Sequence, residues 1–195
     1  MRQYNVFPEC NVDTNLVGHL LGGYPKHKST CNEVVKAVNG SDEFAIGIID
    51  ADKRQATMDE GFEEYELPEP VDGKNRHVAM YIHVDGKRFM FTVKPAMDKF
   101  IMDAANTEGV SMKSAVYSNS LEAFTKETKR IQAATDKKLR RLFDRIAGYP
   151  EMLRLRNTLR YLMHKQYEAD VNVARQFFDG RLTNDDLSVY MKEGI

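Results

Sequence analysis

The chain has 195 residues, with 28 basic and 29 acidic side chains, and 42% of its residues are hydrophobic. This composition excludes a disordered tail, and no apolar run reaches the roughly 18 residues that a transmembrane helix needs. Two cysteines, Cys10 and Cys31, cannot build a disulfide framework and lack zinc-ligand spacing. The N-terminal residues show no signal-peptide pattern, so we expect a cytoplasmic protein without membrane contact.

The first part of the chain alternates between strand and helix patterns. Residues 3–7 predict a strand, and helices are expected over Asn15–Leu21 and over residues 31–39, where Thr30 is a suitable N-cap. Residues 44–50, FAIGIID, are nearly all apolar. That pattern is typical of a strand buried on both faces of a parallel sheet.

A turn-rich, acidic stretch follows over residues 51–75, and we expect it to lie on the surface. Residues 77–84 and 88–93 are rich in β-branched and aromatic residues and flank an Asp-Gly pair, which predicts a β-hairpin. Residues 96–106 then read as a helix. Together these elements predict an α/β fold with a central, mostly parallel sheet and flanking helices, in which the hairpin completes a small four-stranded sheet.

The remainder of the chain has helical spacing. Helices are expected over residues 121–134, 136–146 and 150–164, and residues 168–195 predict one more amphipathic helix, a polar turn and a short helical end. We therefore divide the chain into an α/β domain over residues 1–112 and a basic helical region over residues 113–195.

Charge is distributed unevenly between these parts. Residues 1–112 carry 12 basic and 18 acidic side chains, whereas residues 113–167 carry 13 basic and 5 acidic ones. Such a basic segment suits contacts with the phosphate backbone of DNA or RNA, although solvated helix faces have the same composition. The densest candidates for nucleic-acid binding are Lys129, Arg130, Lys137, Lys138, Arg140, Arg141 and Arg145.

Carboxylates follow two of the expected strands. Glu9 comes after the first strand, and Asp50 and Asp52 come at the end of the buried strand. Because ligands gather beyond the carboxyl ends of strands in an open α/β sheet, these side chains can converge. Oxygen ligands favour Mg²⁺ or Mn²⁺. The simpler alternative is that Asp50 and Asp52 only begin a loop.

The stretches VFPECNVDTNLVGHLL and FAIGIIDADKR together resemble the toprim domain, which primases, topoisomerases, overcoming-lysogenization-defect nucleases and small maturation ribonucleases share. In this resemblance Glu9 corresponds to the conserved glutamate of the family, and Asp50 and Asp52 correspond to its metal-binding pair. The similarity covers roughly the first 54 residues, and the hairpin and following helix extend it to about residue 106.

The resemblance implies a Mg²⁺-dependent nuclease that hydrolyses phosphodiesters in DNA or RNA. Asp50 and Asp52 would hold the metal, and Glu9 would act as a general acid or base or as a third ligand. Lys53 and Arg54 would stabilise charge on the phosphate in the transition state. Asp98 resembles an additional acid that some toprim-like nucleases carry, unless it only occupies the first turn of a helix.

Three functional hypotheses remain open on the sequence. The first is a nuclease in phage defence or RNA maturation, with an ATPase as a possible partner. A non-catalytic toprim-like module that binds nucleic acid or a protein is the second, because Cys10-Asn11 replaces the glycine that usually follows the family's glutamate. The third is a nucleotide-binding or regulatory protein whose acidic loop at residues 59–72 docks a basic partner.

Overall fold

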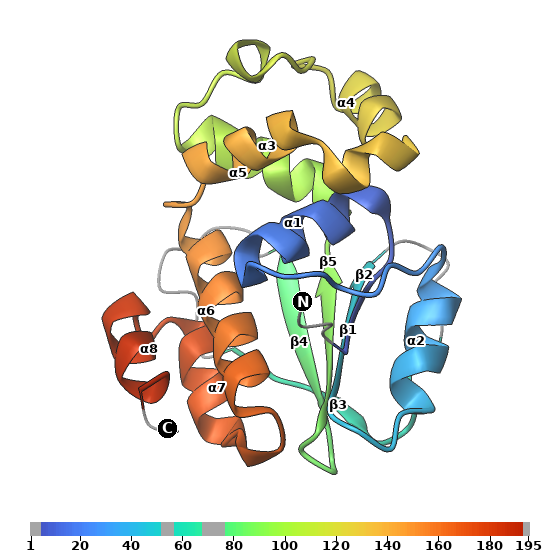
Figure 1. Cartoon of the computed structure of the whole chain (residues 1–195), viewed down its shortest axis with the longest axis vertical. Coiled ribbons are helices and arrows are strands. Elements are labelled where there is room, and N and C mark those ends of the chain that lie inside the picture. The colour runs from blue at the N-terminus through green and yellow to red at the C-terminus, as the bar shows by residue number, and fades with distance from the viewer. Residues whose placement is uncertain (1–4, 52–56, 68–76, 193–195) are drawn as a thin grey trace.

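The computed structural model describes residues 5–51, 57–67 and 77–192. Within them a five-stranded sheet has the order β1-β2-β5-β4-β3 (Figure 1). β1, β2 and β5 run parallel to one another, and β4 runs antiparallel to both of its neighbours, β5 and β3. The strands are β1 (Val6–Pro8), β2 (Ala45–Asp50), β3 (Phe62–Glu64), β4 (Val78–His83) and β5 (Arg88–Val93).

The α/β class is confirmed, and the sheet is mixed, with two parallel and two antiparallel strand pairs. The buried strand and the hairpin lie where the sequence placed them. The expectation of four strands was wrong, because β3 pairs with the outer edge of β4. β3 is only three residues long, and Glu63 and Glu64 are exposed, so its sequence FEE carries almost no strand pattern.

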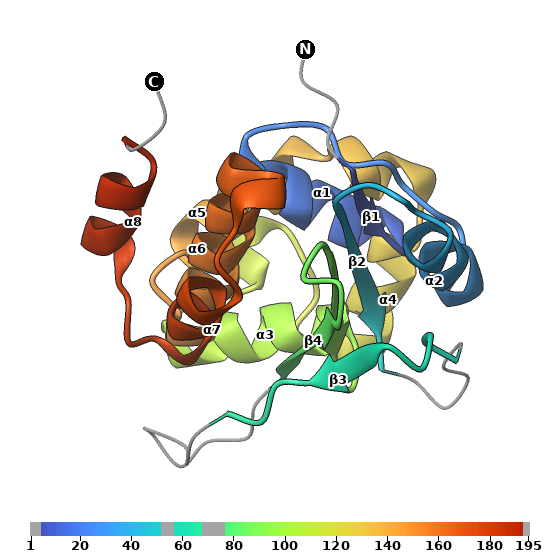
Figure 2. The same ribbon diagram turned by 90° about the horizontal axis from the view of Figure 1, so that it is seen from below.

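Helices cover both faces of the sheet (Figure 2). On one face α2 (Cys31–Asn39), with Thr30 as its N-cap, packs its buried valines on Ile49 and Met90. Gly47 of β2 permits this close approach, since a methyl group there would collide with Met90 and Val34. The opposite face is covered by α1 (Asn11–Leu21), α3 (Met97–Thr107), α6 (Pro150–Lys165) and α7 (Val171–Asp179).

Helix α1 begins four residues before the expected start at Asn15. Cys10 is its N-cap, and a capping box joins it to Asp13, whose carboxylate accepts hydrogen bonds from the Cys10 backbone N–H and from its Sγ–H. Asp13 therefore lies inside the helix, in its first turn, and is fully buried. Neither Cys10, which is extended, nor Asn11, which is helical, needs the positive φ that favours glycine.

The C-terminal part is helical, as expected, but the helix expected over residues 121–134 was wrong in length. α4 (Leu121–Thr128) ends early and a 3₁₀ segment, η2 (Ile131–Thr135), follows before α5 (Lys137–Arg145). The expected turn and short terminal helix are confirmed by α8 (Asn184–Tyr190). In the described part of the chain, no helix combines the length and apolarity needed to cross a bilayer.

The hydrophobic core joins the sheet to these helices. Leu16 of α1, Phe91 of β5, Leu142 of α5 and Leu159 of α6 belong to one buried cluster. Asn15, which is also fully buried, adds polar ties: its Nδ2 donates to the carbonyls of residues 133 and 136 at 2.8 and 2.9 Å. The segment between α4 and α5 is thereby fixed over α1.

A buried ionic network anchors the start of β4. His77 places Nδ1 3.0 Å from Glu151 Oε2 and Nε2 2.9 Å from Asp103 Oδ2. Glu151 Oε1 also accepts from the backbone N–H groups of His77 and Val78, both at 2.8 Å. The hydrogen bond to Glu151 raises the pKa of His77, and the Asp103 contact adds to that increase, against the opposing effect of burial. The network thus ties β4 to α3 and α6.

We predict that Glu151→Gln lowers the free energy of unfolding by about 2 kcal/mol at pH 6, because it removes one of the two charges that hold the His77 imidazolium. A raised folded-state pKa gives stability that is fully present below the ordinary value of 6.5 and is lost as pH rises through the folded value. Denaturant unfolding should therefore show a smaller difference between wild type and variant at pH 9. Glu168→Gln, at an exposed position, is the control; an equal loss at both pH values would contradict this account.

Candidate functional site

Glu9 and Asp50 meet at the carboxyl edge of the parallel strands. Glu9 follows β1, and its backbone N–H donates to the Ile48 carbonyl at 3.1 Å, which continues the pairing with β2. The backbone N–H of Asp50 donates to Glu9 Oε2 at 3.2 Å. Glu9 and Asp50 are 41 positions apart in sequence. Their contact agrees with the expectation that the two residues lie at the same edge of the sheet.

Helix α3 brings Asp98 to the same edge. Asp50 Oδ1 accepts a hydrogen bond of 2.8 Å from the Met97 N–H, the first N–H of α3, so that Asp50 caps this helix from outside. Asp98 lies in the first turn, as one alternative supposed, and is buried. Its Oδ1 accepts a bond of 2.7 Å from Thr128 Oγ at the end of α4.

Asp13 completes a group of four carboxylates, Glu9, Asp13, Asp50 and Asp98, which we call the acidic cluster. Sequence reasoning missed Asp13 because its helix was expected to begin later. The sequence signal was only partial: Asp13 stands three positions after Cys10, which is the spacing of a capping box, but cysteine is an unusual N-cap. Thr128 was missed as well, since nothing in the sequence links it to residue 98.

Like charges act on one another within the acidic cluster. Burial raises the pKa of Asp13, and the charges of Glu9 and Asp98 raise it further, while its bonds from Cys10 oppose this. Burial likewise raises the pKa of Asp50; the Asp13, Glu9 and Asp98 charges add to the increase, and the Met97 N–H opposes it. The Cys10 thiol also has a raised pKa, first from burial and then from Asp13, so it is not an activated nucleophile.

Two helix N-termini partly compensate this repulsion. Asp13 and Asp98 occupy the first turns of α1 and α3, where the helix dipole favours negative charge. Backbone N–H groups also reach the carboxylates of Asp50 and Asp13. The repulsion that remains is of the kind that a divalent cation relieves.

The donor chemistry of the acidic cluster suits Mg²⁺ or Mn²⁺, because all of its side-chain ligands are carboxylate oxygens. In the described ranges, which omit residues 52–56, no three His, Cys, Asp or Glu side chains form a set that could hold one metal ion. Mg²⁺ commonly takes one or two protein carboxylates and completes its shell with water and phosphate oxygens. Glu9 and Asp50 meet that smaller requirement.

Three expected site residues cannot be placed. Asp52, the second half of the expected metal pair, and Lys53 and Arg54, the expected phosphate-binding cations, lie outside the described residues. Ala51, the last described position before them, continues β2, since its N–H donates to the Val93 carbonyl at 2.8 Å.

The expected nucleic-acid-binding residues are all exposed and lie between the end of α4 and the end of α5. Lys129 and Arg130 directly follow Thr128, and Asn11 Nδ2 at the start of α1 donates to the Lys129 carbonyl at 3.3 Å. Arg140 Nε donates to Asn15 Oδ1, and Arg145 donates to Ser114 Oγ. Lys137, Lys138 and Arg141 complete the set on α5.

Comparisons of the chain with protein-family models, with curated proteins and with solved structures returned no match. The interpretation of the site therefore depends on its geometry and chemistry.

We predict that Asp50→Asn stabilises the metal-free protein at pH 8 by roughly 2 kcal/mol, since it removes one buried charge and keeps an oxygen for the Met97 N–H. A carboxyl whose folded pKa lies above its ordinary value of 3.8 binds more protons in the folded state, so stability falls as pH rises above about 4. Urea unfolding in EDTA should show this fall more strongly in wild type than in the variant.

Asp42→Asn provides the control, because Asp42 is exposed near the opposite end of β2. Its stability should follow wild type across the pH range. If Asp50→Asn is less stable than wild type at pH 8, the charges of the acidic cluster do not destabilise the metal-free protein, which would contradict this account.

Proposed function

We propose that the protein is a metal-dependent nucleic-acid phosphodiester hydrolase of toprim type. The observation that carries this proposal is the convergence of Glu9 and Asp50, from the ends of two parallel strands, with Asp13 and Asp98 from two helix N-termini. The parallel pairing of β1 and β2, with a glutamate directly after β1 and an aspartate as the last residue of β2, also agrees with the toprim resemblance.

In this proposal Asp50, with Glu9 or with water, would hold Mg²⁺ or Mn²⁺, which would supply positive charge at a phosphoryl oxygen. Glu9, surrounded by other carboxylates, would hold or move a proton at Oε1 or Oε2. Asp13 and Asp98 keep the site anionic and fix the starts of α1 and α3. Thr128, through its bond to Asp98, fixes α4 and hence the position of the following cations.

Binding of the polymer would use charge rather than sequence. Lys129 and Arg130 lie between α4 and η2. Lys137, Lys138 and Arg141 lie further along the chain, on α5. Exposed cations along this segment suit successive phosphates of DNA or RNA. In this arrangement the carboxylates would hold a metal ion, which would supply positive charge at one phosphate, and the exposed cations would contact the neighbouring phosphates.

We predict that Asp50→Asn and Glu9→Gln each lower cleavage of DNA or RNA by about 100-fold or more in Mg²⁺ or Mn²⁺, because each removes a charged group from the reacting centre. A gel assay with labelled single- and double-stranded substrates measures this. Asp42→Asn should cleave as wild type does. Cleavage that persists in Asp50→Asn would refute the proposed site, and salt-sensitive binding without cleavage by wild type would favour the non-catalytic module.

We predict that Lys129→Ala and Arg130→Ala each reduce the slope of log affinity against log salt by about one, since each removes one phosphate contact. Fluorescence anisotropy with a labelled oligonucleotide in EDTA separates this effect from cleavage. Lys87→Ala is the matched control, because Lys87 is exposed in the β4–β5 turn, away from the carboxyl edge of β5. Equal slopes in all four proteins would remove these two residues from the binding surface.

A further inference from the structure

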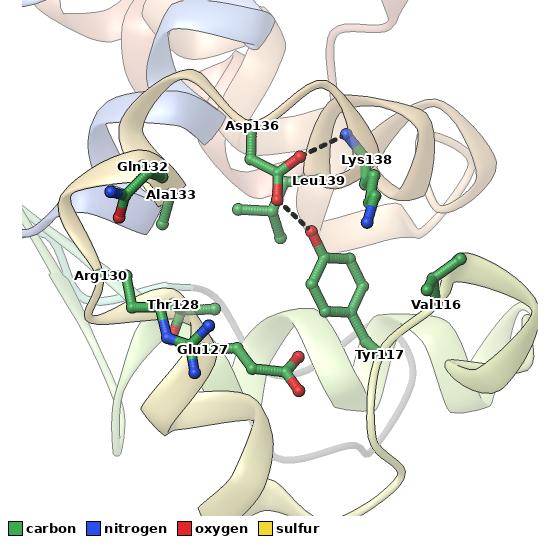
Figure 3. A pocket seen from close by; sticks show the side chains of 10 residues that line it. All are labelled: Val116, Tyr117, Glu127, Thr128, Arg130, Gln132, Ala133, Asp136, Lys138 and Leu139. Atoms are coloured by element: carbon green, nitrogen blue, oxygen red, sulfur yellow. Dashed lines mark hydrogen bonds between the residues drawn. The ribbon is translucent and has the colours of Figure 1, made fainter.

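A pocket of about 320 Å³ adjoins the acidic cluster (Figure 3). Thr128 connects the two, because it lines the pocket and donates a hydrogen bond to Asp98 of the acidic cluster. The remaining lining comes from the segment after the 3₁₀ turn η1 (Lys113–Ala115), from α4, from η2 and the residue before it, and from the start of α5. The pocket volume lies within the range of small-molecule sites in proteins. A group bound here would lie next to a phosphate held at the acidic cluster.

One wall of the pocket is rigid. The Tyr117 ring is buried and packs edge-on against Phe124 with 5.4 Å between ring centroids. Its hydroxyl donates to Asp136 Oδ2 at 2.8 Å, and Asp136 Oδ1 accepts from the Lys138 N–H at 2.7 Å. Both oxygens of Asp136 are thus engaged within the protein, and they hold the aromatic ring in place.

Glu127, unlike Asp136, has a carboxylate oxygen without a hydrogen-bond partner among the described residues. This oxygen, Oε2, is buried. Figure 3 shows the Glu127 side chain across the pocket from Asp136, with its carboxylate directed toward Tyr117. A buried acceptor without a donor is costly, and a ligand that carries an N–H group would satisfy it.

The rim of the pocket is strained and partly apolar. Val116 adopts φ +68°, a left-handed conformation that β-branched residues rarely take, and its side chain is 69% exposed. Strain of this kind is often found at ligand sites. Val116 therefore offers apolar surface at a pocket whose lining also includes polar and charged side chains.

We propose that this pocket holds an unpaired nucleobase with an exocyclic amino group, from a single-stranded nucleic acid. The amino group would donate to Glu127 Oε2, the base would lie against the Tyr117 ring, and Arg130 and Lys138 would contact the adjoining phosphates. A base in a duplex could not reach Glu127 without leaving its stack, which makes single strands the substrate class. The inference rests on the proposed function, since it places the base beside the cleaved backbone.

The test is a binding measurement in EDTA, so that it does not depend on cleavage. Fluorescein-labelled 12-mers of dC and of dT are compared by anisotropy, because cytosine carries an amino group where thymine carries a carbonyl oxygen that a carboxylate repels. Wild type should bind the dC oligomer about five- to tenfold more tightly. Glu127→Gln, whose amide can also donate to a carbonyl oxygen, should bring this ratio close to one.

Glu122→Gln is the matched control, because it makes the same charge change on α4 at an exposed position outside the pocket. Its dC to dT ratio should equal that of wild type. A ratio that Glu127→Gln leaves unchanged, or no binding of either oligomer by wild type, would overturn the proposal. Retained selectivity in Asp50→Asn, together with lost cleavage, would separate the base site from the hydrolytic one.

Discussion

The end of β2 determines the organisation of the site. Asp50 offers its backbone N–H to Glu9 and receives the first N–H of α3 on its carboxylate. One residue therefore couples β1, β2 and α3 at the carboxyl edge of the sheet. α3 in turn positions α4, because Asp98, in the first turn of α3, accepts a hydrogen bond from Thr128 at the end of α4. These contacts connect the acidic cluster, through Asp98 and Thr128, to the neighbouring pocket.

This arrangement conflicts with simple electrostatics. Four carboxylates lie close enough that burial and mutual repulsion raise the pKa values of Asp13 and Asp50. A fold selected only for stability would place apolar or paired groups there, as it does at Val93 or in the His77 network. Functional sites are where such unfavourable charge is usually kept. The helix N-termini reduce the conflict, and a hard divalent cation would resolve it.

Sequence patterns predicted the elements whose signals are local. The apolar run of β2, the Asp-Gly hairpin and the Thr30 cap of α2 each depend on neighbouring residues, and the structure confirms them. β3 was missed because three residues, two of them exposed, carry no alternation, and its strand is set by pairing with β4. The early start of α1 was missed because Cys10 is an unusual N-cap.

The site was predictable to a similar degree. Glu9 and Asp50 were identified because each stands at the carboxyl end of an expected strand, where ligands gather in an α/β sheet, and because both match the toprim pattern. Asp13 and Thr128 were not, since one depended on a helix boundary and the other on how α4 packs against α3. The pocket at Glu127 could not be predicted from the sequence, because its lining residues come from several segments that meet only in the folded chain.

Direct observation of a bound ion would test the central claim most clearly. Electron paramagnetic resonance with Mn²⁺ distinguishes protein-bound from free ions and needs neither substrate nor turnover. The account predicts that wild type and Asp42→Asn bind Mn²⁺ and that Asp50→Asn loses most of that binding. Equal Mn²⁺ binding by wild type and Asp50→Asn, or none by wild type at millimolar concentrations, would contradict it.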